Sequence, residues 1–400
     1  MMSPTELWYR TKKAYALYPG VLAPRSGAFL AKHYAQRRRD RGVARAVLDA
    51  VVGAAFLAWV PARARSVQRK FGLDDEWRQR AVTIARRHFA DPNDLALFRI
   101  EHGDALDSYI RRFEDAALNK IVNPQAWRAE CALADKIRFY ARCAKHGLPH
   151  PRVLARLEHG RVHVIDDWTG QPLLIKPARG EGGRGVAFVT PSDPRDPHWA
   201  RKLLDGRRGA WLVQERIATH EALRDLALNA LPTARMTTIL NERGAPEVVN
   251  AVLRMPSDPA AQVDNMKAGG LLGSIDLESG ALGLACAGYG GGDYMAHPVT
   301  GAAIVGRIVP DWASAKALVA SAHARAFRDY ALVGWDVGFA PGGPVLIEGN
   351  GKPGVLMPQR AGRAGLGGQR YGELLKLQLA RKQIARKAPL SRNKRVAGGE

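Results

Sequence analysis

The spacing of hydrophobic positions divides the chain into a helical first third and a mixed remainder. Apolar residues recur at intervals of three and four, which predicts helices over Asp74–Phe89 and Asp104–Leu118. A further helix is expected over Ala132–Lys145, where a glycine and two prolines follow the pattern. We therefore expect residues 1–130 to form a helical N-terminal region.

Beyond residue 150 the pattern changes to short apolar and β-branched runs that predict strands. These runs are Val153–Leu154, Val162–Ile165, Leu173–Ile175, Val186–Val189, Trp211–Val213, Met236–Leu240, Val248–Leu253, Leu332–Val337 and Leu346–Asn350. Helical patterns over residues 221–229 and 311–328 interrupt them. The alternation predicts an α+β domain over residues 131–375, followed by a basic tail at 376–400.

Composition is typical of a globular, enzymatic chain. The 400 residues are 46% hydrophobic, which is enough for two or three domains with a core. The three cysteines, Cys131, Cys143 and Cys286, include no Cys-x-x-Cys pair, so we expect neither a disulfide framework nor a zinc site. The first 20 residues lack the apolar stretch of a secretory signal, and a reducing cytoplasm is the expected compartment.

The net charge of +22 is concentrated towards the two ends of the chain. Residues 1–130 carry 23 basic and 14 acidic side chains, and residues 376–400 carry eight and one. A nucleic-acid enzyme would be expected to concentrate positive charge at its working site, so nucleic acid is not the expected main partner. The basic tail is either a solvated surface or an anchor to an acidic membrane or polymer.

One apolar segment leaves three interpretations open. Residues 46–62 are apolar apart from Asp49 and have arginines on both sides. Seventeen residues with an internal acid and a proline are few for a spanning helix, which needs about 20 apolar residues. A core helix is the first interpretation, and a peripheral membrane-surface helix and a membrane span are the other two.

Three oxygen-bearing side chains lie at the ends of two predicted strands. Glu348 and Asn350 are two residues apart in a strand, so they face the same way, and Asp336 is available from a neighbouring strand. Two carboxylates and an amide carbonyl suit Mg²⁺, which is usually completed by water and substrate phosphates. The alternative is that these are polar residues at a turn.

A glycine-rich segment, residues 180–185, lies between two predicted strands. Gly180, Gly182 and Gly185 have the spacing of a dinucleotide fingerprint, but that motif must open a helix, and a strand follows here. Glycines in a hairpin let backbone N–H groups approach phosphate oxygens, and Lys176 adds a charge beside them. The segment is either such a phosphate-binding flap or a flexible turn. Downstream, Ala210–Ile217 is either an adenine-binding edge or an ordinary buried strand.

The order of these motifs resembles that of the ATP-grasp superfamily, in its glutamate-ligase-like branch called sugar-transfer-associated ATP-grasp. The resemblance covers residues 131–375. Its motifs are Asp135-Lys136, Gly147–Pro151, Ile175–Pro177 with Gly182, Gly183 and Gly185, Val213–Ile217 with His220, Thr233–Thr238, Asn265 with Gly269-Gly270, Gly334–Val337 and Glu348–Gly354. The chain departs from the family pattern at Gly351-Lys352, where an alanine or serine usually follows the metal-binding asparagine.

The resemblance implies an ATP-grasp fold, in which two α+β subdomains clamp ATP, and it implies a role for each matched residue. For the nucleotide, it implies that Lys136, Lys176, Gly182 and Gly183 hold the phosphates, that Gln214, Glu215 and Ile217 line the adenine, and that His220 or Glu221 reaches the ribose. For the reaction, it implies that Arg235 and Arg254 clamp the transferred phosphoryl group near Lys267, and that Asp336, Glu348 and Asn350 bind Mg²⁺. The bland alternative for the two arginines is a pair of surface residues.

The implied activity is that of an ATP-dependent carboxylate–amine ligase that works through an acyl phosphate. Its partners would be a small-molecule carboxylate and an amine or other nucleophile. Two alternatives remain: a small-molecule or sugar kinase with the same ATP site, and a non-catalytic ATP-binding protein associated with a membrane or polysaccharide.

Overall fold

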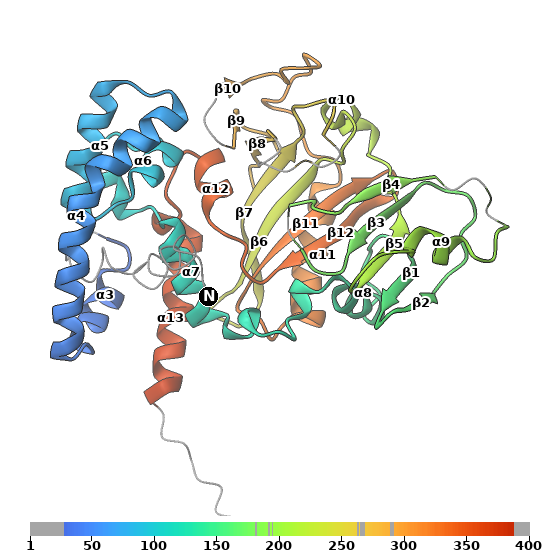
Figure 1. The fold of residues 1–400 in the computed structure, drawn as a ribbon, viewed down its shortest axis with the longest axis horizontal. Coiled ribbons are helices and arrows are strands. Elements are labelled where there is room, and N and C mark those ends of the chain that lie inside the picture. The colour runs from blue at the N-terminus through green and yellow to red at the C-terminus, as the bar shows by residue number, and fades with distance from the viewer. Residues whose placement is uncertain are drawn as a thin grey trace, which may run out of the picture.

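Two antiparallel sheets and a block of helices make up the structure, a computed structural model (Figure 1). It describes residues 28–180, 182–190, 193, 195–261, 264, 269–288 and 292–387. The predicted α+β class and the helical N-terminal region are confirmed. The three cysteines are buried and free of disulfides, as expected.

The N-terminal region forms a helical layer beside the larger sheet (Figure 1). Its elements are α3 (Ala31–Arg39), α4 (Val43–Phe71), α5 (Asp75–His88), α6 (Pro92–Phe98), the 3₁₀ helix η1 (Gly103–Asp107), α7 (Arg112–Val122), and η2 (Pro124–Trp127). The prediction of one continuous helix over 104–118 is wrong, because residues 108–111 between η1 and α7 are not helical. There the backbone N–H and C=O of Ile110 bond to the Gln359 side chain, and this long-range contact replaces helical hydrogen bonds.

The smaller sheet follows a helix, α8, that begins at Lys136. Its elements in chain order are η3 (Ala132–Ala134), α8 (Lys136–Lys145), β1 (Val153–Glu158), β2 (Arg161–Val164), β3 (Leu173–Pro177), β4 (Ala187–Val189), α9 (Trp199–Leu204) and β5 (Trp211–Glu215). The strand order is β2-β1-β5-β3-β4. Strands β3 and β4 pair antiparallel, so the glycine-rich segment joins two strands of one hairpin, as the sequence predicts.

The larger sheet has the order β10-β9-β8-β7-β6-β11-β12. Its strands and the connecting helices are η4 (Glu221–Leu223), α10 (Arg224–Ala227), β6 (Thr233–Leu240), β7 (Pro246–Met255), β8 (Leu271–Ser274), β9 (Ala285–Ala287), β10 (Asp293–Tyr294), α11 (Trp312–Ala326), β11 (Leu332–Ala340) and β12 (Gly343–Asn350). The chain ends with α12 (Leu356–Ala361), η6 (Leu366–Gly368) and α13 (Arg370–Lys387). The short strands β8, β9 and β10 were not anticipated from the sequence.

Strand alternation gives the larger sheet two chemically different faces. Met236, Leu253 and Trp335 join the main hydrophobic core, together with residues of α8 and α11. Arg235 and Asp336, each adjacent in sequence to one of these residues, point to the opposite face and line a cavity. The buried face holds the sheet in place, and the opposite face is therefore free to carry charge.

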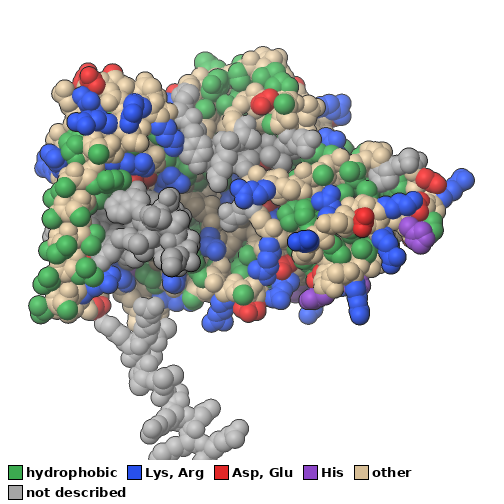
Figure 2. All heavy atoms as spheres, in the orientation of Figure 1, with side chains coloured by type: hydrophobic (Ala, Val, Ile, Leu, Met, Phe, Trp, Pro, Cys, Tyr) green, Lys and Arg blue, Asp and Glu red, His purple; other side chains and the backbone are tan. Residues whose placement is uncertain are grey.

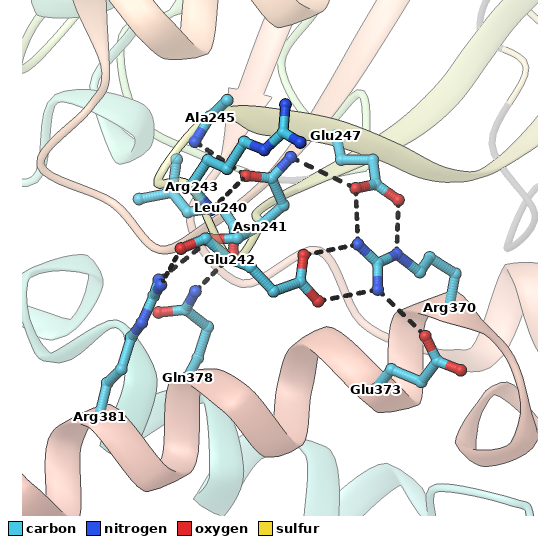
Figure 3. A network of polar contacts seen from close by, with 10 residues as sticks. All are labelled: Leu240, Asn241, Glu242, Arg243, Ala245, Glu247, Arg370, Glu373, Gln378 and Arg381. Carbon is cyan, nitrogen blue, oxygen red and sulfur yellow. Dashed lines mark hydrogen bonds and ion pairs between the residues drawn. The ribbon is translucent and has the colours of Figure 1, made fainter.

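Helix α13 is anchored to the turn between β6 and β7 by the polar contacts of Figure 3. Arg370 forms ion pairs with Glu242 and Glu247 at 2.7 Å each, and Arg381 donates to the carbonyl of Glu242, also at 2.7 Å. The domain boundary expected at residue 375 thus falls inside a helix that packs on the sheet, and the part of the basic tail up to residue 387 is helical.

Candidate functional site

A cavity of about 690 Å³ lies between the two sheets. Strands β3, β4 and β5 line it from the smaller sheet, and β6, β7, β11 and β12 line it from the larger one. Its charged lining residues are Lys136, Lys176, Arg184, Arg216, Arg235, Arg254, Asp264, Asp336, Glu348 and Lys352. Basic side chains outnumber acidic ones in this lining, as expected for a site that binds an anion.

Asp336 is the electrostatic centre of the cavity. Strand register places it beside Arg235 of β6, whose guanidinium binds both of its carboxylate oxygens. Arg254 of β7 donates to the same carboxylate at 3.1 Å. Burial alone would raise the pKa of Asp336, but the two guanidinium groups outweigh it and hold that pKa below its usual value. Asp336 is therefore a permanently ionised carboxylate in a buried position.

Arg254 has a second carboxylate partner, Asp264. Its guanidinium lies 3.3 Å from a carboxylate oxygen of Asp264, and that carboxylate also accepts hydrogen bonds from the amide and hydroxyl of Thr233. Burial raises the pKa of Asp264, and Arg254 only partly offsets it. The sequence reasoning missed Asp264, although it directly precedes the motif residue Asn265.

Lys176 enters the cavity from β3 and is almost fully buried. Its ammonium donates to the hydroxyl of Tyr140 at 2.7 Å and lies 4.9 Å from the centre of the same ring. Burial and the charge of Lys136 lower the pKa of Lys176 to about 7, while Glu348 and Asp336 partly offset them. The charged form of Lys176 is therefore destabilised until an anion enters the cavity. Tyr140, which the sequence analysis did not identify, holds the ammonium in position through its hydroxyl.

Glu348 and Asn350 line the cavity beside Asp336, as the strand argument predicts. Asp336 and Glu348 are direct register partners on β11 and β12, and Asn350 follows two residues later. Glu348 lies 3.6 Å from the ammonium of Lys136, and the side-chain nitrogen of Asn350 is buried without a hydrogen-bond partner. Two carboxylates and an amide on one wall form a donor set that fits Mg²⁺. In the part of the chain that the structure describes, no three His, Cys, Asp or Glu residues cluster closely enough to hold a metal without such an amide.

The end of the cavity beside the smaller sheet is largely apolar. Leu174, Phe188 and Ile217 contribute to its walls. Gln214 also lines it and is buried, and its side-chain oxygen has no hydrogen-bond partner. An unpaired acceptor in an apolar slot costs free energy unless a ligand donor satisfies it, and a flat heteroaromatic ring with an amino group would do so.

The glycine-rich segment covers the cavity near Lys136. Gly182 and Gly183 line the cavity and have φ angles of 74° and 73°, which disfavour any side chain. Gly185 has a φ of 79°, and an added Cβ would lie 3.3 Å from the Trp211 ring. Lys136 donates to the carbonyl of Gly180 at 3.1 Å, which fixes the start of the segment.

Four predicted residues are not among the described residues of this lining. The carboxylate of Glu215 accepts from the backbone amide of Arg152 at 3.0 Å, outside the cavity lining. His220 caps a 3₁₀ helix by accepting from the amide of Ala222. Lys267 lies outside the described residues. Glu221, the alternative to His220 for the ribose, is also absent from the lining, and the remaining residues predicted for ATP, the phosphoryl group and Mg²⁺ all line the cavity.

Residues 202–371 match the family described as sugar-transfer associated ATP-grasp. The match spans less than half of the chain and includes the strands that carry the two arginines and the acidic residues. It supports assignment to the ATP-grasp superfamily. No curated protein matches the sequence.

Solved structures of similar fold include three ligases. The L-amino acid ligase from Bacillus licheniformis is 12% identical, with a TM-score of 0.32 over 55% of this chain and 40% of that one. The D-alanine–D-alanine ligase from Coxiella burnetii is 13% identical, with a TM-score of 0.37 over 64% and 60%. The D-alanine–D-alanine ligase from Bacillus anthracis complexed with ATP is 15% identical, with a TM-score of 0.37 over 64% and 68%. The chain thus spans between 40% and 60% of the length of the first two structures.

Proposed function

We propose that this chain, a member of the ATP-grasp superfamily through residues 202–371, is an ATP-dependent ligase that joins a carboxylate to an amine. One observation supports the proposal most strongly: four cationic side chains line a single cavity that also holds the buried carboxylates of Asp264 and Asp336. The four are Lys136, Lys176, Arg235 and Arg254. Phosphoryl transfer requires positioning and neutralisation of charge more than a covalent residue. The lining supplies both.

The nucleotide would lie with its base at the apolar end and its phosphates under the glycine-rich segment. Gln214 offers its unpaired oxygen to the amino group of adenine. Lys136 and Lys176 approach from α8 and β3, where the triphosphate passes from the smaller sheet towards the larger one. Entry of an anion also removes the cost of the buried positive charge on Lys176.

Mg²⁺ is the expected companion of the phosphates, held by Asp336, Glu348 and Asn350. When bound, it neutralises the charge on phosphate oxygens. Arg235 and Arg254 keep Asp336 ionised, so the carboxylate is available as a ligand at every physiological pH. Both arginines also remain within the cavity lining, where they can contact the transferred phosphoryl group with bidentate bonds.

In the proposed reaction a substrate carboxylate attacks the γ-phosphorus of ATP and releases ADP. The resulting acyl phosphate is then attacked by an amine, which forms the amide and releases phosphate and a proton. Within the described lining, the carboxylates of Asp264, Asp336 and Glu348 each lie within 4 Å of a cationic side chain. A substrate carboxylate is already ionised at neutral pH, so its attack on ATP needs no general base from the lining.

Hydroxylamine trapping tests the proposal directly. The purified chain with ATP, Mg²⁺ and a panel of acids should release ADP and form a hydroxamate only with a suitable acid. An acid labelled with ¹⁸O should transfer one labelled oxygen to the phosphate. Release of AMP, or a phosphorylated alcohol in place of the hydroxamate, would contradict the proposal.

A pair of matched variants makes the test specific to the cavity. Glu348→Gln should lower turnover by about 10² to 10³ fold, the usual loss when one group that stabilises transition-state charge is removed. Glu278→Gln makes the same chemical change at an exposed position outside the cavity and should leave turnover unchanged. Equal activity of the two variants would exclude Glu348 from the reaction.

A further inference from the structure

Helix α4 exposes an apolar surface that the rest of the described chain leaves uncovered. Val43, Val47 and Val51 have exposed fractions of 83%, 60% and 61%. The most apolar 18-residue window of the helix is long and hydrophobic enough to cross a membrane, yet only 17% of it is buried. The core-helix interpretation of residues 46–62 is therefore wrong.

From Val47 onwards, the exposed valines and the buried residues of α4 lie on opposite sides of the helix. Gly53, Val60 and Ala64 are buried and belong to the side that packs towards α5 and α6. With 3.6 residues per turn, Val47 and Val51 fall on the side opposite to them. Figure 2 shows hydrophobic side chains along the outer edge of the molecule where Figure 1 places α4.

The charges of α4 complete an amphipathic pattern. Its single acidic residue, Asp49, is buried and paired with Arg41 and Arg45, so it adds no negative charge to the exposed side. Towards the end of the helix, Arg65 and Arg69 are exposed and fall on the same side as the valines. The outer face is thus apolar along its first half and basic along its second half.

We propose that the exposed face of α4 binds the surface of an anionic lipid bilayer. The valines would enter the boundary between headgroups and acyl chains, and the arginines would extend to lipid phosphates. A membrane span is disfavoured, because it would carry the Asp49 ion pairs into hydrocarbon and separate Val60 and Ala64 from the protein core. A second copy of the chain fits less well, because parallel helices would bring the arginines of the two copies together, and antiparallel helices would place the arginines of each copy against the valines of the other.

Vesicle sedimentation of the full chain tests this surface. The protein should sediment with phosphatidylcholine vesicles that contain about 30 mol% of the anionic lipid phosphatidylglycerol, because exposed arginines are attracted to an anionic surface. It should remain in solution with phosphatidylcholine alone, and high salt should release it, because exposed charges are screened. Absence of binding to anionic vesicles at low salt would overturn the proposal.

Two double variants distinguish binding through the exposed face of α4 from nonspecific hydrophobic binding. The double variant Val47→Glu/Val51→Glu should lose vesicle binding by at least about tenfold, because two apolar side chains that would enter the bilayer are replaced by two negative charges. The control Val164→Glu/Val299→Glu changes two valines that are also exposed, 54% and 47%, but lie elsewhere. It should bind like the unaltered chain.

Three results would count against α4 as the lipid-binding face. One is retained binding by Val47→Glu/Val51→Glu, and another is an equal loss in the control. The third is a dimer that this double variant dissociates, measured by sedimentation velocity, with no vesicle binding by the unaltered chain. ATP binding by each variant, measured separately, verifies the fold, so a failure here leaves the proposed ligase activity untouched.

Discussion

The buried ammonium of Lys176 makes nucleotide binding dependent on pH. Burial and Lys136 lower its pKa to about 7, so the unliganded chain loses this positive charge as pH rises above 7. ATP phosphates stabilise the charged form, which raises the pKa of Lys176 in the complex. Binding above pH 7 must therefore take up a proton, and affinity should fall as pH rises.

The change in ATP affinity with pH depends on the difference between the pKa of Lys176 in the free chain and its pKa in the ATP complex. Each pH unit between them costs about 1.36 kcal/mol, or tenfold in Kd. The free chain holds about half of Lys176 in its charged form at pH 7 and only about 1% at pH 9, so Kd should rise up to about 50-fold between these pH values. Below pH 7 the side chain is charged in both states, and its contribution becomes constant.

Isothermal titration calorimetry measures this proton directly. ATP is titrated between pH 7.5 and pH 9, where a phosphate with its second pKa near 6 stays ionised, in buffers of different ionisation enthalpy. The unaltered chain should take up close to one proton, and Lys176→Met should take up much less. Lys145→Met, an exposed lysine on the same helix as Lys136, is the control and should behave like the unaltered chain. A pH dependence of Kd that persists unchanged in Lys176→Met would refute the reasoning.

Three further substitutions test an ion pair in the cavity and two polar contacts that hold the larger sheet in place. Arg235→Lys keeps the charge but loses the bidentate bond to Asp336, so turnover should fall about 10² fold with unchanged circular dichroism; normal turnover would argue for a surface role. Asn123→Ala leaves the buried amide of Ala331 and the buried carbonyl of Leu332 without the Asn123 side chain as partner. It should lower the free energy of unfolding by about 1–3 kcal/mol in urea titrations, and an unchanged midpoint would contradict this. Arg370→Ala should speed amide exchange in the turn around Glu242, and unaltered protection would show that the ion pairs of Figure 3 are dispensable.

Much of the cavity could be predicted from strand alternation. Glu348 and Asn350 occupy alternate positions of one strand, and both line the cavity beside Asp336. The same rule shows why the prediction for Glu215 was not supported by the described lining. Gln214 and Glu215 are neighbours in β5, and neighbouring side chains in a strand face opposite sides of the sheet, so only one of them could line the slot.

Other features depend on contacts between distant parts of the chain. The helix expected over 104–118 has suitable spacing, but the Gln359 side chain binds the backbone of Ile110 from 249 residues away and breaks it. Asp264 gains its importance from Thr233 and Arg254, which lie on two other segments. Periodicity contains no information about such partners, because it describes only which side of an element each residue occupies.

Lys136 shows how the cavity joins a part of the chain before the family match to strands within it. It lies 66 residues before the match begins at residue 202, and it precedes the hairpin that carries the glycine-rich segment. Its ammonium donates to the carbonyl of Gly180 over the smaller sheet and lies 3.6 Å from Glu348 on the larger one. Any opening between the two sheets must lengthen at least one of these contacts. Lys136, which we propose binds the phosphates, therefore keeps both contacts only when the two sheets are close together.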